Sequence, residues 1–484
     1  MSSQSVANYL LAALNSAGVD RFFIAPGSRS QALALAANQL EKLGKARTTV
    51  RLDERSLAFT ALGSALATGK PAAVIVTSGT AVGNLMPAVL EAHHSRVPMI
   101  LITADRPARL RGTGANQTLE MQSGIFGFAA RAIDLPIDVS DAELLAAAEE
   151  AAKSHGPIQL NLQLDLPLSD GKLGLPDVEL SVSGSSNSEN EVAVPIDDAA
   201  VVIAGHGGQA AAEFAKSANL PLIAEPSSGA RHGETAIQFP LLALEKNAAQ
   251  IQRAIVFGRP TLSRAVQALL ARAELWLDQS AVNLGLSPKA GIAGAGKLVP
   301  RGLGSAEWLG AFQVSRELTA REQFVERVWQ NSARLFLGAS DLIRDLDQVA
   351  AGKQLEVYSN RGLAGIDGTV STALGVAMEQ GETTLLIGDL TLLHEVGGLN
   401  LSDLGQPPLK IVVGNDSGGH IFTRLEIADE IDAASLERFF VTPQRVDVAA
   451  LAKAYGWQYV TCKNLDELDA ALANPGPLLI DYQL

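Results

Sequence analysis

Two carboxylates in the last third of the chain each follow a short apolar segment. The segment 385–387 leads into Gly388-Asp389, and the segment 411–413 leads into the letters NDSGG at 415–419. Two carboxylates with backbone carbonyls beside them suit a Mg²⁺ ion that substrate phosphates also bind, because Mg²⁺ prefers hard oxygen ligands. The amides of Gly418 and Gly419 could add an anion-binding nest. The pattern favours a metal-diphosphate site over its alternative, a helix-capping Asp followed by an Asn-Asp-Ser-Gly turn.

The elements that would position these carboxylates are two β-strands joined by a crossover. Asp389 and Asp416 lie 27 positions apart, which favours a crossover between parallel neighbours in one sheet. Both carboxylates would then leave the same edge of that sheet. Ligands of open α/β sheets bind outside the carboxyl ends of the strands, so we expect the site there.

Charged residues occupy similar strand-to-loop junctions elsewhere in the chain. Glu54 follows a strand expected near 49–52, and by position alone it reads as an acid favoured at a helix start. Arg29, Arg106 and Arg361 also follow expected strands. An arginine fork binds a carboxylate in a bidentate way, and an acidic protein needs local arginines to bind acidic substrates. Three arginines at such junctions favour substrates that carry carboxylates.

Alternating strands and helices organise the whole chain. Residues 5–170 read as repeated β-α units, 169–195 as a polar linker rich in Ser and Gly, and 311–331 as a helical connection. The other expected strands lie at 200–204, 221–224 and 254–257 in a middle region, and at 477–482 at the end of a last region that starts near 333. This pattern predicts an α/β fold of three doubly wound parallel-sheet domains, at 1–180, 196–310 and 311–484.

Length and composition narrow the functional classes. The chain has 484 residues, of which 47% are apolar and 5% aromatic, with 44 Gly, as in Ala-, Val- and Leu-rich α/β layers. A formal charge of −14 and an isoelectric point near 5.0 argue against general nucleic-acid binding. The single cysteine, Cys462, excludes an intrachain disulfide and a multi-cysteine metal site. We see no leader pattern and no apolar run of transmembrane length, so we expect a soluble, cytoplasmic protein without a membrane span.

The carboxylate pair resembles the diphosphate-binding motif of the thiamine diphosphate enzymes. That motif usually begins Gly-Asp-Gly and ends Asn-Asn, whereas this chain has Leu390 in the third position and Asp416 in place of the second Asn. An Asp can still coordinate Mg²⁺, so the departure is compatible with a metal site. Three α/β regions of comparable size are also the layout of the thiamine diphosphate decarboxylase superfamily. The resemblance therefore covers essentially the whole chain and implies the thiamine diphosphate-binding fold.

Seven further segments make the resemblance more specific. In chain order they are APGSRS at 25–30, DER at 53–55, TSGTA at 77–81, TADRP at 103–107, GANQ at 114–117, YSNRG at 358–362 with GIDG at 365–368, and GGHIF at 418–422. Together they resemble the family of 2-succinyl-5-enolpyruvyl-6-hydroxy-3-cyclohexene-1-carboxylate synthases of menaquinone biosynthesis. The resemblance implies a transferase that decarboxylates 2-oxoglutarate and adds the succinyl carbanion to isochorismate. It implies thiamine diphosphate and Mg²⁺ as cofactors, with Mn²⁺ as an alternative ion.

The same resemblance implies a role for individual residues. Glu54 would activate the cofactor, Ile366 would bend it, and the carboxylates of Asp389 and Asp416 with the Gly418 carbonyl would bind the metal. The other expected cofactor contacts are Gly388, Gly419 and Ile421, and the expected catalytic residues are Glu54, Arg29, Gln117 and Arg361. The expected substrate-binding residues are Ser28, Arg29, Arg106, Asn116, Gln117, Ser340, Arg344, Arg361, Ile421, Phe422 and Leu425.

The superfamily also implies an assembly, and it leaves alternatives open. Its site lies between the N-terminal domain of one subunit and the C-terminal domain of another, which implies a homodimer or a homotetramer. One alternative is a related 2-oxoacid decarboxylase or oxidase, which could carry a flavin on the middle domain. Another is a regulatory member that binds cofactor without turnover, and the retained Glu54 argues against it. An effector site on the middle domain is a further option.

Overall fold

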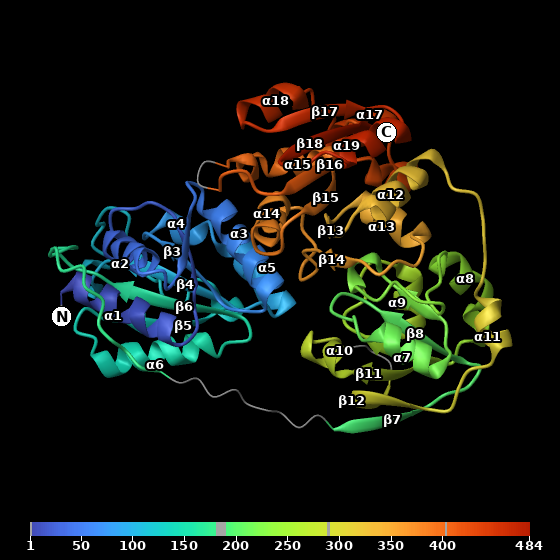
Figure 1. The fold of residues 1–484 in the computed structure, drawn as a ribbon, viewed down its shortest axis with the longest axis horizontal. Helices are drawn as coiled ribbons and strands as arrows, with labels where there is room; N and C mark the ends of the chain where they lie inside the picture. The colour runs from blue at the N-terminus through green and yellow to red at the C-terminus, as the bar shows by residue number, and fades with distance from the viewer. Residues whose placement is uncertain (1, 181–189, 288–290, 402–403) are drawn as a thin grey trace. The chain divides into compact units, whose positions relative to one another are not determined.

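Three parallel β-sheets form the framework of the chain. The computed structural model describes residues 2–180, 190–287, 291–401 and 404–484 (Figure 1). Each sheet has six strands, and neighbouring strands pair in parallel throughout. The predicted α/β class with three parallel sheets is confirmed. Among the described helices, none is long and apolar enough to cross a membrane.

The first sheet has the strand order β2-β1-β3-β4-β6-β5. Its strands are β1 (Arg21–Ile24), β2 (Arg47–Val50), β3 (Ala72–Val76), β4 (Met99–Asp105), β5 (Arg131–Leu135) and β6 (Pro157–Gln163). Its helices are α1 (Ser3–Ser16), α2 (Gln31–Lys42), α3 (Glu54–Thr68), α4 (Thr80–Gly83), α5 (Met86–Ser95) and α6 (Asp141–Ala152). Central strands such as β3 are buried along their whole length, so both faces need a cover. Helices α1, α2 and α6 pack on one face, and α3 and α5 on the other.

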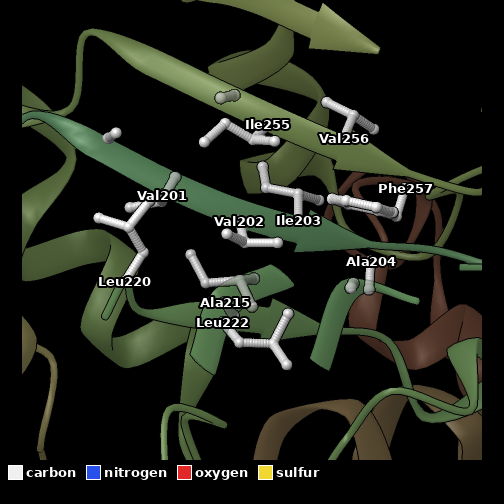
Figure 2. Close-up of a cluster of buried hydrophobic side chains, with 14 of the residues drawn as sticks. Val201, Val202, Ile203, Ala204, Ala215, Leu220, Leu222, Ile255, Val256 and Phe257 are labelled. Carbon is white, nitrogen blue, oxygen red and sulfur yellow. The ribbon is translucent and has the colours of Figure 1, made fainter. Parts of the chain in front are cut away.

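The second sheet has the order β7-β12-β11-β10-β8-β9. Its strands are β7 (Glu191–Pro195), β8 (Ala200–Ala204), β9 (Leu222–Ala224), β10 (Arg253–Phe257), β11 (Glu274–Asp278) and β12 (Ile292–Arg301). Its helices are α7 (Ala211–Ala218), α8 (Pro240–Asn247), α9 (Arg264–Leu270), α10 (Gln279–Asn283) and α11 (Ala306–Ala311). Figure 2 shows the core of this sheet, where Val202 and Ile203 of β8 lie between Ile255 of β10 and Leu222 of β9.

The third sheet repeats the strand order of the first, as β14-β13-β15-β16-β18-β17. Its strands are β13 (Arg334–Leu337), β14 (Glu356–Tyr358), β15 (Thr383–Gly388), β16 (Leu409–Asn415), β17 (Gln458–Cys462) and β18 (Leu478–Gln483). The helices of this part of the chain are α12 (Ala320–Asn331), α13 (Asp341–Val349), α14 (Thr369–Gln380), α15 (Asp389–His394), α16 (Ile427–Glu430), α17 (Ala433–Leu436), α18 (Val448–Ala454) and α19 (Leu465–Leu472), of which α14 belongs with the first sheet. The equal order makes β1, β3 and β4 of the first sheet correspond to β13, β15 and β16 here.

The chain divides into two compact units. The first unit holds residues 1–185 together with 362–381 and 395–407, so it contains the first sheet and helix α14. The second unit holds residues 186–361, 382–394 and 408–484, so it contains the other two sheets. The division into three domains at 1–180, 196–310 and 311–484 stays a prediction.

Three predicted element boundaries are wrong. The strand expected near 49–52 lies at Arg47–Val50, and Arg51, which follows it, is buried. The expected linker 169–195 contains strand β7, which pairs with β12 more than 100 positions away, and its residues 181–189 lie outside the described residues. The expected helix 311–331 starts only at Ala320, where Thr319 and Glu322 form a capping box.

Candidate active site

The two carboxylates at the edge of the third sheet lie on neighbouring strands, as predicted. Strands β15 and β16 pair in parallel, with Gly388 opposite Gly414. Asp389 is the first residue of helix α15, and Asp416 follows the end of β16. The long crossover between them therefore returns the chain to the same edge of the sheet.

Burial and charge show that the two carboxylates are close to each other. Asp389 is only 5% exposed, and its pKa is raised to about 6. Burial is the main cause and the nearby charge of Asp416 is the second, whereas the backbone N–H groups of Leu390, Asp389 and Gly418 oppose the rise. A divalent cation would relieve this repulsion. Two adjacent carboxylates fit Mg²⁺, which takes oxygen ligands and shares them with phosphates.

The turn after β16 is built around glycines that other residues could not replace. The N–H of Ser417 donates to the side chain of Asn415 at 3.1 Å, and the N–H of Gly419 donates to the carbonyl of Val441 at 2.7 Å. A Cβ on Gly418 would lie 2.8 Å from the Val441 carbonyl oxygen. The close approach of Val441 requires glycine at 418, because any side chain there would force the turn apart.

An arginine that the sequence reasoning missed holds this edge together. Arg321 of helix α12 donates to Asp416 Oδ2 at 2.8 Å, to Asp341 at 2.9 Å and to Asp345 at 2.6 Å. Arg424 binds Asp345 as well, at 2.7 Å. No local motif marks Arg321, because its three acidic partners lie 20 to 95 positions away.

The expected substrate residues of the second unit occupy two environments. Ser340 is the N-cap of helix α13 and has a φ of 107°, and the exposed Arg344 donates to the Ser340 carbonyl. Arg361 follows β14 and is only 3% exposed. Its guanidinium donates to the Thr261 hydroxyl and lies near the carboxyls of Glu225 and Asp347. Arg361 therefore has internal partners, and its binding to substrate stays a prediction.

The expected pocket residues Ile421, Phe422 and Leu425 are half-buried in and after the 3₁₀ turn His420–Arg424.

In the first unit, Glu54 is the first residue of helix α3 and is half-buried. Asp53 caps this helix by accepting the N–H of Arg55 at 3.1 Å. The carboxylate of Glu54 accepts the side-chain amide of Asn84 at 3.2 Å. Its place at the helix start agrees with the simple positional interpretation, and that place leaves the carboxylate partly accessible to a ligand.

Five other predicted residues gather at the carboxyl edge of the first sheet. Arg29 donates to the Leu164 carbonyl at 2.8 Å, and Arg106 donates through Nε to the Asn116 carbonyl at 2.7 Å. The pKa of Arg29 is lowered, first by burial and then by the nearby charge of Arg106. Gln117 donates to the Ser78 carbonyl at 3.0 Å. Ser28 is exposed beside Arg29.

Buried amides support the loop that carries Arg106, Asn116 and Gln117. Gln122 accepts the N–H of Gly79 at 2.9 Å and donates to the Ala104 carbonyl and the Asn161 side chain. Asn161 in turn donates to Asp105 at 3.0 Å. This chain of hydrogen bonds fixes the start and the end of the loop relative to β4 and β6.

Family models match both ends of the chain. Residues 4–125 match the model "Thiamine pyrophosphate enzyme, N-terminal TPP binding domain", and residues 346–482 match "Thiamine pyrophosphate enzyme, C-terminal TPP binding domain". The first range contains Glu54, Arg29 and Arg106, and the second range contains Asp389 and Asp416. The predicted thiamine diphosphate-binding fold is thereby confirmed.

Curated relatives resemble nearly the whole chain. A 2-succinyl-5-enolpyruvyl-6-hydroxy-3-cyclohexene-1-carboxylate synthase of Leifsonia xyli subsp. xyli (strain CTCB07) is 41% identical, over 96% of this chain and 93% of the relative. One of Renibacterium salmoninarum is 41% identical, over 98% and 92%, and one of Arthrobacter sp. (strain FB24) is 40% identical, over 95% and 85%. The chain belongs to this synthase family. Its members are enzymes, so the predicted family and the enzyme class are confirmed.

A solved structure extends the likeness to the fold of the superfamily. The crystal structure of benzoylformate decarboxylase from Polynucleobacter necessarius matches with a TM-score of 0.70 at 16% identity, over 100% of this chain and 99% of that chain. The identity is low, so the match concerns the fold alone. This chain and that decarboxylase thus share one overall fold.

Proposed function

We propose that the chain decarboxylates 2-oxoglutarate and adds the resulting succinyl group to isochorismate, forming 2-succinyl-5-enolpyruvyl-6-hydroxy-3-cyclohexene-1-carboxylate and CO₂ in menaquinone biosynthesis. The observation that carries the proposal is the roughly 40% identity to curated synthases along nearly the whole chain. Bound thiamine diphosphate would supply the carbanion chemistry, and the protein binds, orients and electrostatically tunes it.

Glu54 is the proposed acid-base group of the reaction. A carboxyl group that faces the aminopyrimidine can hold a proton at a ring nitrogen and return it during turnover. Glu54 suits this role because it begins helix α3 and keeps its carboxylate partly accessible. Ile366 is the proposed apolar support that bends the cofactor, and it is half-buried in the segment before helix α14.

The edge of the third sheet is the proposed site for the diphosphate and its metal ion. Asp389, Asp416 and the Gly418 carbonyl would bind Mg²⁺, or Mn²⁺ in its place, and diphosphate oxygens would complete the coordination. Within the described residues, no cluster of three His, Cys, Asp or Glu side chains could hold an ion alone. That finding supports a site in which the cofactor itself provides ligands. Gly388, Gly419 and Ile421 would contact the cofactor beside the ion.

Arginines are the proposed anchors for the acidic substrates. Arg29 and Arg106, with Ser28, Asn116 and Gln117, would bind isochorismate at the edge of the first sheet. Their support is the proximity of two guanidinium groups, which favours an anion between or beside them. Ser340 and Arg344 would bind 2-oxoglutarate, and Arg361 would contribute from its buried position. Phe422 and Leu425 would line the reaction pocket.

We also propose an assembly and a compartment for the enzyme. The minimum active unit would be a homodimer, which could in turn form part of a homotetramer. In the homodimer, the first region of one subunit and the last region of the other would form each site. We further propose that the enzyme acts in the cytoplasm, in keeping with its acidic composition.

One assay tests the proposed function. The purified protein is mixed with thiamine diphosphate, Mg²⁺, 2-oxoglutarate and isochorismate, and the loss of isochorismate is followed together with CO₂ release. We expect both to proceed in equal amounts and to stop when either substrate is left out. Release of CO₂ without loss of isochorismate would contradict the synthase and indicate a simple 2-oxoacid decarboxylase instead.

A further inference from the structure

Buried carboxylates accept hydrogen bonds from the backbone at both ends of the segment that carries Ile366. It runs from Gly362 to the first turn of helix α14 and belongs to the first unit. Glu91 of helix α5 and Glu395, which follows α15, are 4% and 0% exposed. Neither carboxylate has a role in the reaction proposed above. Buried carboxylates are costly unless they are well bonded, so their partners show what they do.

Glu91 binds the entrance of the segment. One carboxylate oxygen accepts the N–H of Gly362 at 2.6 Å, and the other accepts the N–H of Leu363 at 2.7 Å. The hydroxyl of Ser95, one turn further along helix α5, donates to the first oxygen at 2.9 Å. A Cβ on Gly362 would lie 2.6 Å from the backbone oxygen of Glu91, so the approach is as close as glycine allows. Two charge-assisted bonds to adjacent amides fix both the position and the direction of the chain there.

Glu395 binds the exit of the segment. Its carboxylate accepts the N–H of Val370 at 2.6 Å and the N–H of Ser371 at 3.2 Å, and it also accepts the Ser371 hydroxyl. These amides belong to the first turn of α14, whose N-cap, Gly368, offers no side chain. A carboxylate is the preferred partner of such unpaired amides.

Arg51 connects this second carboxylate to the helix of Glu54. Its guanidinium donates to the Thr60 hydroxyl of α3 at 2.6 Å and to the Ser371 hydroxyl of α14 at 3.2 Å. It also donates to the carbonyls of Gly398 at 3.0 Å and Asn400 at 3.1 Å, in the turn that follows Glu395. Glycines let the two helices pack backbone to backbone, since a Cβ on Gly63 would overlap the Thr372 carbonyl.

We infer that Glu91 and Glu395 are positioning residues. They hold the backbone of the 362–371 segment in place, so that the side chain of Ile366 keeps the position needed to bend the cofactor. The inference rests on the role proposed for Ile366. Neither carboxylate is placed to touch a substrate; each acts through backbone amides. Because a displacement of about 1 Å at a reacting group can cost ~10²-fold in rate, loosening either end would slow activation of the cofactor.

Glu91→Gln and Glu395→Gln test the inference, because an amide keeps the shape but replaces one acceptor oxygen with a donor. Glu379→Gln is the matched control: Glu379 is also a bonded carboxylate, but it binds Arg21 and Ser64 at the other end of α14. Two readouts apply. In the protein without cofactor, amide hydrogen exchange over 362–371, measured by mass spectrometry, should be at least ~10-fold faster in the two test variants than in the control. With thiamine diphosphate and Mg²⁺, exchange of the thiazolium C2 proton for deuterium should be ~10-fold or more slower.

The outcomes separate this inference from the proposed function. If wild-type protein forms product and both test variants exchange the C2 proton within twofold of Glu379→Gln, the positioning role is wrong and the synthase stands. If wild-type protein forms no product, the proposed function fails, and the amide exchange still decides whether the carboxylates hold the segment. Should a Gln variant fail to fold, Ser371→Ala replaces it. That change removes the hydroxyl that contacts both Glu395 and Arg51, and we expect faster amide exchange there and slower C2 exchange. Wild-type rates in Ser371→Ala would also overturn the inference.

Discussion

The first and third sheets share one strand order but present opposite charges at their carboxyl edges. Arg29 and Arg106 follow β1 and β4 of the first sheet, whereas Asp389 and Asp416 follow β15 and β16 of the third. Each edge brings two like charges together. Burial and the neighbour lower the pKa of Arg29, and burial and the neighbour raise the pKa of Asp389 to about 6. Like charges held together favour a ligand of the opposite sign, so one edge suits carboxylates and the other suits a cation.

The two edges are also supported differently. Buried amides, mainly Gln122 and Asn161, hold the loop of the first edge together with the buried carboxylate of Asp105, which pairs with Arg111 of the same loop. The third edge uses an ion network in which Arg321 binds Asp416 and two further acids. The same framework therefore accommodates different chemistry through a few residues at the strand ends, as expected where function lies in sites built on a common fold.

Loss of the third-edge charge pair should have the largest effect. Asp389→Ala should weaken binding of Mg²⁺ and of thiamine diphosphate together, because in the proposed site the ion would join the diphosphate to the protein. We expect a loss of at least ~10³-fold in cofactor affinity by calorimetry, with activity lost in parallel. Arg109→Ala serves as the control, since it removes an exposed ion pair with Asp165. Unchanged cofactor affinity in Asp389→Ala would show that the diphosphate site lies elsewhere.

Glu54→Gln should separate cofactor binding from turnover. The amide cannot exchange the proton that the proposed mechanism requires, so kcat should fall by at least ~10²-fold. Cofactor affinity should remain largely intact, because the carboxylates of the third edge are unchanged. A variant that binds cofactor and retains near-normal kcat would remove Glu54 from the acid-base role.

Local sequence predicted the strand ends of both edges but not the residues that support them. Gly388-Asp389 and Asn415-Asp416 could be placed because apolar strands and glycine turns are encoded by neighbouring residues. Arg51 and Arg321 could not, because most of their partners lie 20 to 349 positions away and become neighbours only after folding. Strand β7 was missed for the same reason, since its pairing with β12 is a long-range contact. The family resemblance supplied the proposed site residues, whose roles stay predictions, without explaining what holds them.

The arginines of the first edge should affect substrate use rather than stability. Arg29→Ala and Arg106→Ala should each lower kcat/KM for isochorismate by about 30- to 10³-fold, equivalent to roughly 2–4 kcal/mol for a lost charge-assisted contact. Arg344→Ala should show the same effect with 2-oxoglutarate. A substrate-binding arginine changes kcat/KM at constant melting temperature, whereas a structural one lowers the melting temperature. Arg361→Ala is expected to do both, because Arg361 also bonds to Thr261. Unchanged kcat/KM for both substrates in a stably folded variant would exclude that arginine from the site.

The smallest effect is expected on the melting temperature of the protein without metal or cofactor, when one aspartate of each edge is replaced in turn. Asp389 has a raised pKa, so the unfolded chain loses this proton near pH 4 and the folded protein only near pH 6. Its charge therefore reduces stability increasingly between these values and fully above pH 6. Asp389→Asn should raise the melting temperature at pH 8, by up to a few °C, and leave it nearly unchanged at pH 4.

Asp105→Asn should act in the opposite direction. Asp105 is buried and paired with Arg111 at 2.7 Å, so its removal breaks an ion pair whose other member stays partly buried. The melting temperature of Asp105→Asn should be lower than that of wild type at pH 8. Addition of thiamine diphosphate and Mg²⁺ should reverse the order of the melting temperatures of wild type and Asp389→Asn, because only wild type would keep both proposed metal ligands and gain the stability of binding. Equal melting temperatures for wild type and Asp389→Asn at pH 8, with and without the cofactors, would contradict the charge repulsion at the third edge.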